Sequence, residues 1–484
     1  MNIKFVGNII GRLLIIESIF LLPSLGISVY DQDGVHNSLI ATIFVCLISG
    51  YTLYQFTKDY LSQRYYAQEG LITVGLAWLI LSIFGALPFW LSGQIPNYVD
   101  ALFETVSGFT TTGSSILSNV EGLSRSLLFW RSFTHWLGGM GILVFMMAIV
   151  PLGKDAGYSL HIMRAESPGP IVSKLTPRMG NTAKILYEMY FILSIACLIC
   201  YLLGDMPLFE ALCHTFGTAG TGGFGVLNDS MMSYSPYIQW TTTIFMTLFG
   251  VNFSVYFFLI LREYATALLD EELRLYLILL VGSSLLITFN IRPLYGTLEE
   301  SLRHAFFQVS TTMTTTGYAT ADFDLWPSFS KTLLVLCMIW GACAGSTGGG
   351  IKIARVLLLV KALRRNILHS VRPRATQTVL VNGRPMDEQI IQNTNAYLSA
   401  YCIIIMVSVL LLSLEGYPFE TNVTAVLSCF NNIGPGLQMV GPTCNFGFFN
   451  NFSKLLLTLV MLLGRLEIFP ILALFSRRAW IRSL

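Results

Sequence analysis

A five-residue pattern recurs four times along this chain, and it constrains the fold more than any other feature. Each copy has a bulky apolar residue, three further residues that are mostly small or polar, and then a glycine. Phe109 and Gly113 bound the first copy, and Phe430 and Gly434 bound the last. The four glycines are 107, 97 and 117 residues apart. This spacing predicts a structural unit of about a hundred residues that occurs four times.

The composition places these units in a membrane. Hydrophobic residues make up 54% of the chain and charged residues 12%, whereas a soluble protein has roughly 25% charged residues. The net charge of +2 gives no reason to expect a nucleic-acid partner. Ten apolar segments are long enough, at about 20 residues, to cross a bilayer, and we expect the first to be retained as a span. These segments are 9–29, 37–57, 70–95, 128–150, 183–204, 238–261, 273–292, 332–360, 395–414 and 453–475.

A shorter stretch, too short to span the hydrocarbon core, precedes each glycine. We expect these stretches to be half-helices that enter the membrane without crossing it. The predicted fold is an all-α polytopic membrane protein with four pseudo-fourfold repeats around one pore and two extra N-terminal spans. Each repeat is a span, a half-helix, a filter loop and a second span. The predicted half-helices are 101–109, 208–216, 305–313 and 423–430, and the predicted units are 1–68 for the N-terminal pair and 69–152, 182–265, 272–369 and 392–484 for the repeats.

Charged residues predict the orientation in the membrane. Basic residues gather in the loops on one side of the predicted spans, above all within 361–384, and acidic residues gather on the other side. Because basic loops favour the cytoplasmic side, we expect both termini there. The glycine loops would then enter the membrane from outside.

The glycine loops have the properties of a cation filter. Stacked backbone carbonyls can replace the hydration shell of a potassium ion, and glycine allows the backbone angles that turn carbonyls inward. Irregular backbone survives at membrane depth only around a water-filled path, so four copies in frame favour a pore over small residues that serve only helix packing. The predicted filter residues are Thr110, Thr111, Thr112, Gly113, Gly217, Thr218, Ala219, Gly220, Thr314, Thr315, Thr316, Gly317, Asn431, Asn432, Ile433 and Gly434.

With these motifs the chain resembles the Trk/Ktr/HKT superfamily of potassium transporters, most closely its bacterial uptake subunits, over nearly its whole length. The resemblance is carried by residues 108–114, 218–224, 313–323 and 430–434. It implies one potassium pore formed by four non-identical repeats, potassium as the transported ion, no cofactor, and a homodimer. In that family a serine in place of the first filter glycine accompanies sodium permeation, so Gly113 implies a preference for potassium.

The second span of the third repeat contains a glycine-rich interruption. Each glycine costs a helix roughly 1 kcal/mol relative to alanine, so we expect this span to be broken within the membrane. The segment half-resembles a phosphate-binding loop, but its lysine comes one residue late and spans flank it. The family resemblance implies instead a gate beneath the filter. The residues of this predicted gate are Gly345, Ser346, Thr347, Gly348, Gly349, Gly350 and Lys352.

A charged residue, Arg465, interrupts the second span of the fourth repeat and completes the predicted gate. It directly follows Gly464, which aligns with a glycine in each of the other copies. A charge at this depth is expensive and usually faces the bundle interior or water. Two roles stay open: an electrostatic barrier in the pore, or a structural tie to Glu467 or to backbone carbonyls.

The transport mode also stays open. One possibility is conduction through a gated pore; the alternative is a secondary carrier that couples potassium to proton or sodium movement, although such carriers are typically built on inverted repeats. An enzyme is not expected, because no histidine lies in a metal-ligand spacing and no G-x-S-x-G sequence occurs. The resemblance implies the bacterial inner membrane and a TrkA-like cytosolic ring of nucleotide-binding regulatory subunits that contacts 361–384.

Overall fold

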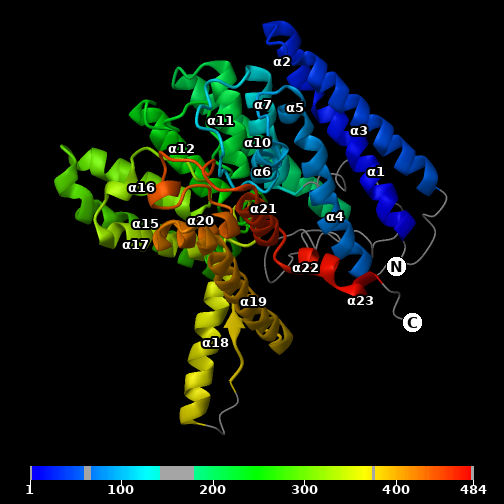
Figure 1. Ribbon diagram of the computed structural model, residues 1–484. Helices are drawn as coiled ribbons and strands as arrows, with labels where there is room; N and C mark the ends of the chain where they lie inside the picture. The colour runs from blue at the N-terminus through cyan, green and yellow to red at the C-terminus, as the bar shows by residue number, and fades with distance from the viewer. Residues whose placement is uncertain (1–2, 59–66, 142–178, 373–376, 481–484) are drawn as a thin grey trace.

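The computed structural model describes residues 3–58, 67–141, 179–372 and 377–480 (Figure 1). These residues are almost entirely helical, with one antiparallel hairpin formed by β1 (Leu380–Val381) and β2 (Arg384–Pro385). Six helical segments within them are long and apolar enough to cross a membrane, or up to seven if one bent pair counts as a span. The count of ten spans therefore stays a prediction, and the span expected at 128–150 extends beyond the described residues.

The N-terminal pair of helices packs against the side of the molecule. α1 (Ile3–Phe20) lies along α3 (His36–Thr57), and Figure 1 shows both at one edge. Gly11 and Gly50 allow this close approach, because a Cβ atom on either would lie closer than 3.0 Å to the backbone of the opposite helix. The outer face of α3 carries exposed apolar side chains, including Phe44 and Ile48, as expected of a surface that meets lipid.

Four short helices precede the four glycine loops. Two of them begin earlier than predicted because polar N-caps lie upstream of the apolar stretch: Asn97 accepts a hydrogen bond from the Val99 N–H, and Thr297 accepts one from the Glu300 N–H. The helix of the fourth copy also begins earlier, after Pro418, and the helix of the second copy begins at Leu208 as predicted. A longer helix or helix pair precedes each short helix. The short helices are α6 (Tyr98–Phe109), α11 (Leu208–Gly220), α16 (Leu298–Met313) and α20 (Phe419–Asn431), and the longer ones are α4 (Ala67–Gly85) with α5 (Leu87–Leu91), α10 (Met179–Leu203), α15 (Glu271–Ile291) and α19 (Glu388–Leu412).

The helices that follow the loops end within one residue of the glycine shared by the four copies in the first, second and fourth copies, and eight residues before it, at Trp340, in the third. The sequence predicted such a break in the third copy only, so the breaks inside the spans expected at 238–261 and 453–475 were not predicted, and the two spans themselves stay a prediction. In the second copy Asn252 caps a new helix, which turns 88° from the first. In the fourth copy Glu467 and Ile468 have positive φ angles, and the next helix begins at Phe469 with Pro470 in its first turn. The helices before the breaks are α7 (Arg125–Gly139), α12 (Pro236–Phe249), α17 (Ser328–Trp340) and α21 (Asn451–Arg465), and those after are α13 (Phe253–Ile260), α18 (Ile353–Val371) and α22 (Phe469–Phe475).

α18, the hairpin and α19 extend away from the helical body (Figure 1). A small core of Leu358, Ala362, Val379 and Ile391 holds them together. The remaining short elements connect the longer ones. They are α2 (Leu22–Asp31), α14 (Tyr264–Leu268), α23 (Arg477–Trp480), and the 3₁₀ turns η2 (Arg292–Leu294), η3 (Phe323–Leu325), η4 (Ser413–Glu415) and η5 (Gln438–Val440).

Candidate functional site

The four short helices end in the same backbone conformation. In each, a non-glycine residue just after the helix has a positive φ angle of 52° to 59°, and a glycine with a positive φ of 78° to 106° follows two residues later. The residue between them donates its N–H to a carbonyl five residues earlier, in the Schellman pattern of helix ends. Left-handed angles are costly for threonine and asparagine, and such strain gathers at functional sites. The residue pairs are Thr111 and Gly113, Thr221 and Gly223, Thr315 and Gly317, and Asn432 and Gly434.

In the second copy this loop conformation occurs three residues later in the chain than the predicted filter residues. The sequence predicts Gly217, Thr218, Ala219 and Gly220 as its filter residues, but these four lie in the last turns of α11. The Gly217 carbonyl accepts the helix-ending bond from the Gly222 N–H at 2.8 Å. The residues equivalent to the other three loops are therefore 220–223. This copy has several glycines close together, so more than one of them could be matched to Gly113. The prediction matched Gly220, whereas the backbone conformation matches Gly223.

The four loops close into a ring in chain order. In three of the four contacts a Cβ atom on the glycine of one loop would lie 1.9 to 2.1 Å from the carbonyl oxygen of the next, closer than real Cβ atoms come, and in the fourth it would lie 3.0 Å away, which is tighter than most Cβ contacts. Because all four residues also have positive φ angles, glycine is strongly favoured at each of these positions. The contacts run from Gly113 to the Gly222 carbonyl, from Gly223 to the Thr316 carbonyl, from Gly317 to the Ile433 carbonyl, and from Gly434 back to the Thr112 carbonyl.

A cavity of about 150 Å³ lies against this ring, and all four glycines line it. The chain segments that follow the loops complete its wall, with Ser114, Phe224 and Pro435 among them. The cavity is the meeting point of all four copies, as a single path through the ring requires.

Buried hydroxyl and amide groups support the loops from behind. Thr110 and Thr112 share a hydrogen bond of 2.7 Å between their Oγ1 atoms, and the corresponding bond between Thr314 and Thr316 is 2.8 Å. Asn432 crosses between copies, because its Nδ2 donates to the Thr112 Oγ1 at 2.9 Å. These side chains therefore point behind the loops and hold the backbone in place.

An ion pair braces the boundary between the first and second copies. Glu104 on α6 and Arg131 on α7 are almost fully buried, and Arg131 Nε donates to Glu104 at 2.6 Å. Glu104 also accepts from Ser115 and from the Ile116 N–H, just beyond the first loop. The Arg131 guanidinium lies 3.4 Å from the centre of the Phe224 ring, just beyond the second loop.

Sequence reasoning did not assign this brace. The signal that could have found it is a charge on each of two neighbouring apolar helices, since charges at membrane depth are usually paired. His135, one turn beyond Arg131, joins the same boundary. Its Nδ1 lies 2.7 Å from the Gly108 carbonyl oxygen, and its Nε2 accepts from the Phe224 N–H at 3.2 Å.

The glycine-rich segment 345–350 lies directly against the loops. The Gly349 N–H donates to the Thr315 Oγ1 at 2.6 Å, and a Cβ atom on Gly349 would overlap the Asn431 carbonyl. On its other side the segment binds the break between α12 and α13: the Phe253 N–H donates to the Gly345 carbonyl at 3.1 Å. It therefore lies between the ring and a bent helix.

Two buried cations contact this segment. Lys352 is 2% exposed, and its Nζ donates to the Gly348 carbonyl. Arg465 is 9% exposed and donates to the Thr347 carbonyl at 2.9 Å and to the Gly139 carbonyl at 2.7 Å. Arg465 thus joins the first, third and fourth copies through backbone carbonyls.

Glu467 binds a different arginine. Its carboxylate accepts from Arg355 Nη1 at 3.1 Å, which links α18 to the break after α21. The sequence left two structural ties open for Arg465, one to Glu467 and one to backbone carbonyls. The structure shows hydrogen bonds from Arg465 to carbonyls.

Comparison with known proteins identifies a family of transport proteins. The sequence model of the TrkH family, described as a cation transport protein, matches residues 35–480. The chain is 36% identical to the Trk system potassium uptake protein TrkH of Salmonella typhimurium, with 99% of this chain and 100% of the relative covered. It is 33% identical to the Trk system potassium uptake protein TrkG of Escherichia coli K12, with 99% of each chain covered.

The fold also matches a solved structure. The crystal structure of the potassium transporter TrkH from Vibrio parahaemolyticus superposes with a TM-score of 0.88 at 31% sequence identity, covering 99% of this chain and 100% of that one. The apolar helices and these relatives indicate a multi-pass membrane transport protein and not an enzyme. This chain belongs to the TrkH family of cation transport proteins.

Proposed function

We propose that this chain is the membrane subunit of a potassium uptake system and that potassium passes through the ring of four glycine loops. The observation that carries the proposal is the closure of the ring through backbone contacts between successive loops. With no side chain between neighbouring loops, main-chain oxygens are the groups available to an ion. In the second copy we assign the filter to 220–223, in place of the earlier 217–220.

The surroundings of the ring favour a cation. Each loop directly follows the C-terminus of a short helix, so four helix C-termini meet at the ring. A helix C-terminus carries a partial negative charge, and its interaction with a nearby cation is typically about 0.3–1 kcal/mol. Four such ends favour potassium over an anion without placing a fixed charge in its path.

The segment 345–350 is the proposed gate. It contacts the loops of the third and fourth copies and is held by polar bonds from the break in α12–α13 and from Arg465. Its glycines let the backbone take other paths at little steric cost. Movement of this segment away from the ring would open the way to the cytoplasm.

We assign the chain to the bacterial inner membrane as a homodimer, with both termini in the cytoplasm. A TrkA-like nucleotide-binding ring would dock on the side where α18 and the hairpin project. One support is the Trk system named for the relatives. The other is the set of basic residues on α18, such as Arg364 and Arg365, since this helix follows the proposed gate in the chain.

The test is rubidium flux into proteoliposomes that contain the purified chain, under an imposed voltage. We expect rubidium uptake that potassium inhibits more strongly than sodium. The rival function, a coupled carrier, requires proton or sodium movement in fixed ratio to rubidium, and a pH-sensitive dye inside the vesicles distinguishes the two.

The gate has its own test. Shortening 345–350 to two residues should give flux that no longer depends on the cytosolic partner. A folded, membrane-inserted variant that stays as closed as the parent would show that the gate lies elsewhere.

A further inference from the structure

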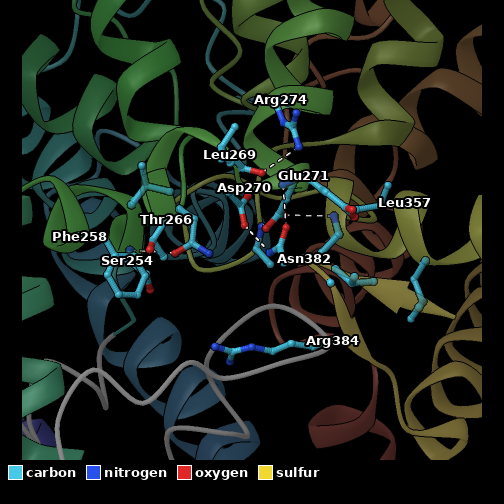
Figure 2. A pocket seen from close by; sticks show the side chains of 18 of the residues that line it. Ser254, Phe258, Thr266, Leu269, Asp270, Glu271, Arg274, Leu357, Asn382 and Arg384 are labelled. Atoms are coloured by element: carbon cyan, nitrogen blue, oxygen red, sulfur yellow. Dashed lines mark hydrogen bonds between the residues drawn. The ribbon is translucent and has the colours of Figure 1, made fainter. Parts of the chain in front are cut away.

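A second cavity, of about 720 Å³, lies beside the proposed gate (Figure 2). Its wall is formed by α13, α14, the start of α15, α18 and the hairpin. This volume lies in the range of sites that hold small organic molecules. It is distinct from the cavity at the ring, which all four glycines of the loops line.

Two carboxylates line this cavity without a cationic partner. Asp270 caps α15 by accepting from the Leu273 N–H at 2.8 Å and also accepts from the Asn382 side chain at 2.7 Å. Figure 2 shows Asp270 and Asn382 facing each other. Glu271 between the carboxylates is paired with Lys361. Within the described part of the chain, neither Asp270 nor Glu272 forms an ion pair, so no cationic side chain there is paired with them.

Apolar side chains form the larger part of the remaining wall, and Arg274 and Arg384 are the basic side chains among the lining residues. Val255, Phe258, Leu269, Leu357 and Met386 contribute to it. An aromatic ring attracts a nearby ammonium group by about 0.5–2 kcal/mol, so Phe258 suits a positively charged ligand with an apolar body. Among the described residues no group of three His, Cys, Asp or Glu side chains could hold a metal ion. The lining therefore favours an organic cation over a metal.

Glu272 connects this cavity to the gate. Its Oε1 accepts hydrogen bonds from the Ala344 N–H at 2.5 Å and from the Ala354 N–H at 3.1 Å. Ala344 directly precedes the segment 345–350, and Ala354 follows it at the start of α18. One carboxylate thus joins the two ends of the gate. Hydrogen bonds to an ionised carboxylate are roughly twice as strong as neutral ones, so their strength depends on the charge of Glu272.

We propose that this cavity binds a small organic cation and that the bound cation favours gate opening. The ammonium group pairs with Asp270 and Glu272, and the apolar body lies against Phe258. The ammonium group competes with the Ala344 and Ala354 N–H groups for the Glu272 carboxylate and so weakens its two bonds to the ends of the gate, which frees the segment to leave the ring. The effect on transport rests on the proposed function of 345–350, whereas the binding does not.

Arg384 provides an internal check on the sign of the ligand's charge. It lines the cavity from the hairpin, is exposed, and forms no ion pair among the described residues. Figure 2 shows its side chain lying apart from the other labelled residues. A positive charge at this position repels a cation and attracts an anion, so removing it has opposite effects on the two.

Binding is tested by thermal unfolding of the purified full chain in detergent, titrated with 1,4-diaminobutane. A ligand that binds the folded state raises the unfolding temperature. We expect stabilisation by the diamine, with affinity reduced tenfold or more in Glu272→Gln and in Asp270→Asn. Arg384→Ala should bind about twofold tighter, from the repulsion of a unit charge about 8 Å away in water. Arg365→Ala, an arginine of α18 outside the cavity, is the matched control and should bind as the parent does.

Three results would overturn the binding proposal. One is no stabilisation by the diamine in the parent chain. The second is that magnesium stabilises the parent, the diamine does not, and the magnesium effect is lost in the two carboxylate variants, which would indicate a metal site. The third is that inorganic phosphate stabilises the parent and this effect is lost in Arg384→Ala, which would indicate an anion site. Asp270→Asn keeps the proposal testable if Glu272→Gln does not fold, because Asp270 does not bind the gate.

The coupling is tested by rubidium flux in the same preparations. The diamine, added on the side to which α18 projects, should raise flux severalfold in the parent, and Glu272→Gln should have raised flux that no longer responds. If the diamine binds the parent chain but does not change its rubidium flux, the coupling is overturned and the binding site is not. Diamine binding to a chain that carries no rubidium contradicts the proposed function and leaves the cavity assignment standing.

Discussion

The ring of glycine loops and the layer of helix breaks beneath it are both made of four parts, but the parts are alike only in the ring. In the ring, every copy has the same pair of left-handed residues and the same backbone contact to the next copy. In the layer beneath, the second copy has an 88° bend, the third a glycine-rich segment and the fourth Arg465.

The difference indicates a division of tasks. A ring that coordinates one ion with backbone oxygens needs four similar contributions, since a change in any loop distorts the whole. Opening and closing needs no such similarity, and one moving segment with one anchoring charge is sufficient. We therefore assign selection to what the copies share and gating to what differs between them.

The largest expected effect concerns the buried ion pair of Glu104 and Arg131 beside the ring. Arg131→Met leaves the Glu104 carboxylate buried without its cation, which typically costs about 3–5 kcal/mol. We expect a marked fall in unfolding temperature in detergent. The double variant Glu104→Gln, Arg131→Met should recover most of this loss, since the third copy has Gln308 at the position of Glu104.

Arg125→Met is the matched control for that experiment. Arg125 lies on the same helix, and its side chain is 54% exposed in a pair with Asp31, so its loss should cost only about 0–1 kcal/mol. Equal destabilisation by the two arginine variants would contradict a special role for the brace.

The second prediction tests Arg465 as a barrier. A unit charge about 6 Å from a passing cation costs on the order of 3 kcal/mol at an effective dielectric near 20, which is about a hundredfold in rate. Arg465→Ala should raise potassium flux by up to that factor. Arg465→Lys keeps the charge but cannot reproduce the contacts to the Thr347 and Gly139 carbonyls.

The lysine variant therefore separates the two roles left open for Arg465. Low flux in Arg465→Lys means that the charge matters, and flux as high as in the alanine variant means that the hydrogen bonds hold the gate closed. An alanine variant that is unstable and slow would refute the barrier.

The third prediction concerns one quarter of the ring. Gly113→Ser forces a side chain into the carbonyl of the next loop at a φ of 78°, a strain of about 1–3 kcal/mol. We expect sodium to gain on potassium by about tenfold in flux competition. Gly282→Ser, on α15 with open space around its Cβ position, should keep the parent's selectivity, and unchanged selectivity in Gly113→Ser, Gly223→Ser, Gly317→Ser and Gly434→Ser would refute the filter assignment.

The smallest expected effect concerns the hydroxyls behind the loops. Thr112→Val keeps the side-chain shape but removes the bonds to Thr110 and Asn432, each of which contributes about 1 kcal/mol. We expect a selectivity loss of about fivefold, measured by the same competition. Thr332→Val, on the exposed side of α17, should have no effect, and a selectivity loss of equal size there would remove the argument for hydroxyl support.

Sequence reasoning recovered the features that depend on composition and spacing. The four short helices and the family followed from the recurring glycine and the apolar segments around it. It missed features that depend on a single polar side chain. Asn252 restarts a helix after the bend, and Thr297 caps α16, which begins seven residues before the predicted stretch 305–313. Both are recognisable as caps only once the helix boundaries are known.

The register error in the second copy has a related cause. Residues 220–223 contain three glycines, so an alignment by glycine alone has several solutions. The hydrogen bond from the Gly222 N–H to the Gly217 carbonyl selects one of them. Pairs such as Glu104 with Arg131 were out of reach for another reason, because residues on different helices are brought together only by the packing of the whole bundle.

The ring also differs from one assembled from identical subunits in how it responds to mutation. In a symmetric tetramer a single altered codon changes all four quarters at once. Here each quarter is encoded separately, from Gly113 in the first to Gly434 in the last, so mutations can alter one, two, three or all four quarters independently. The same separation lets a lineage adjust one quarter while three keep their hold on the ion, which makes graded change of ion preference available to this architecture.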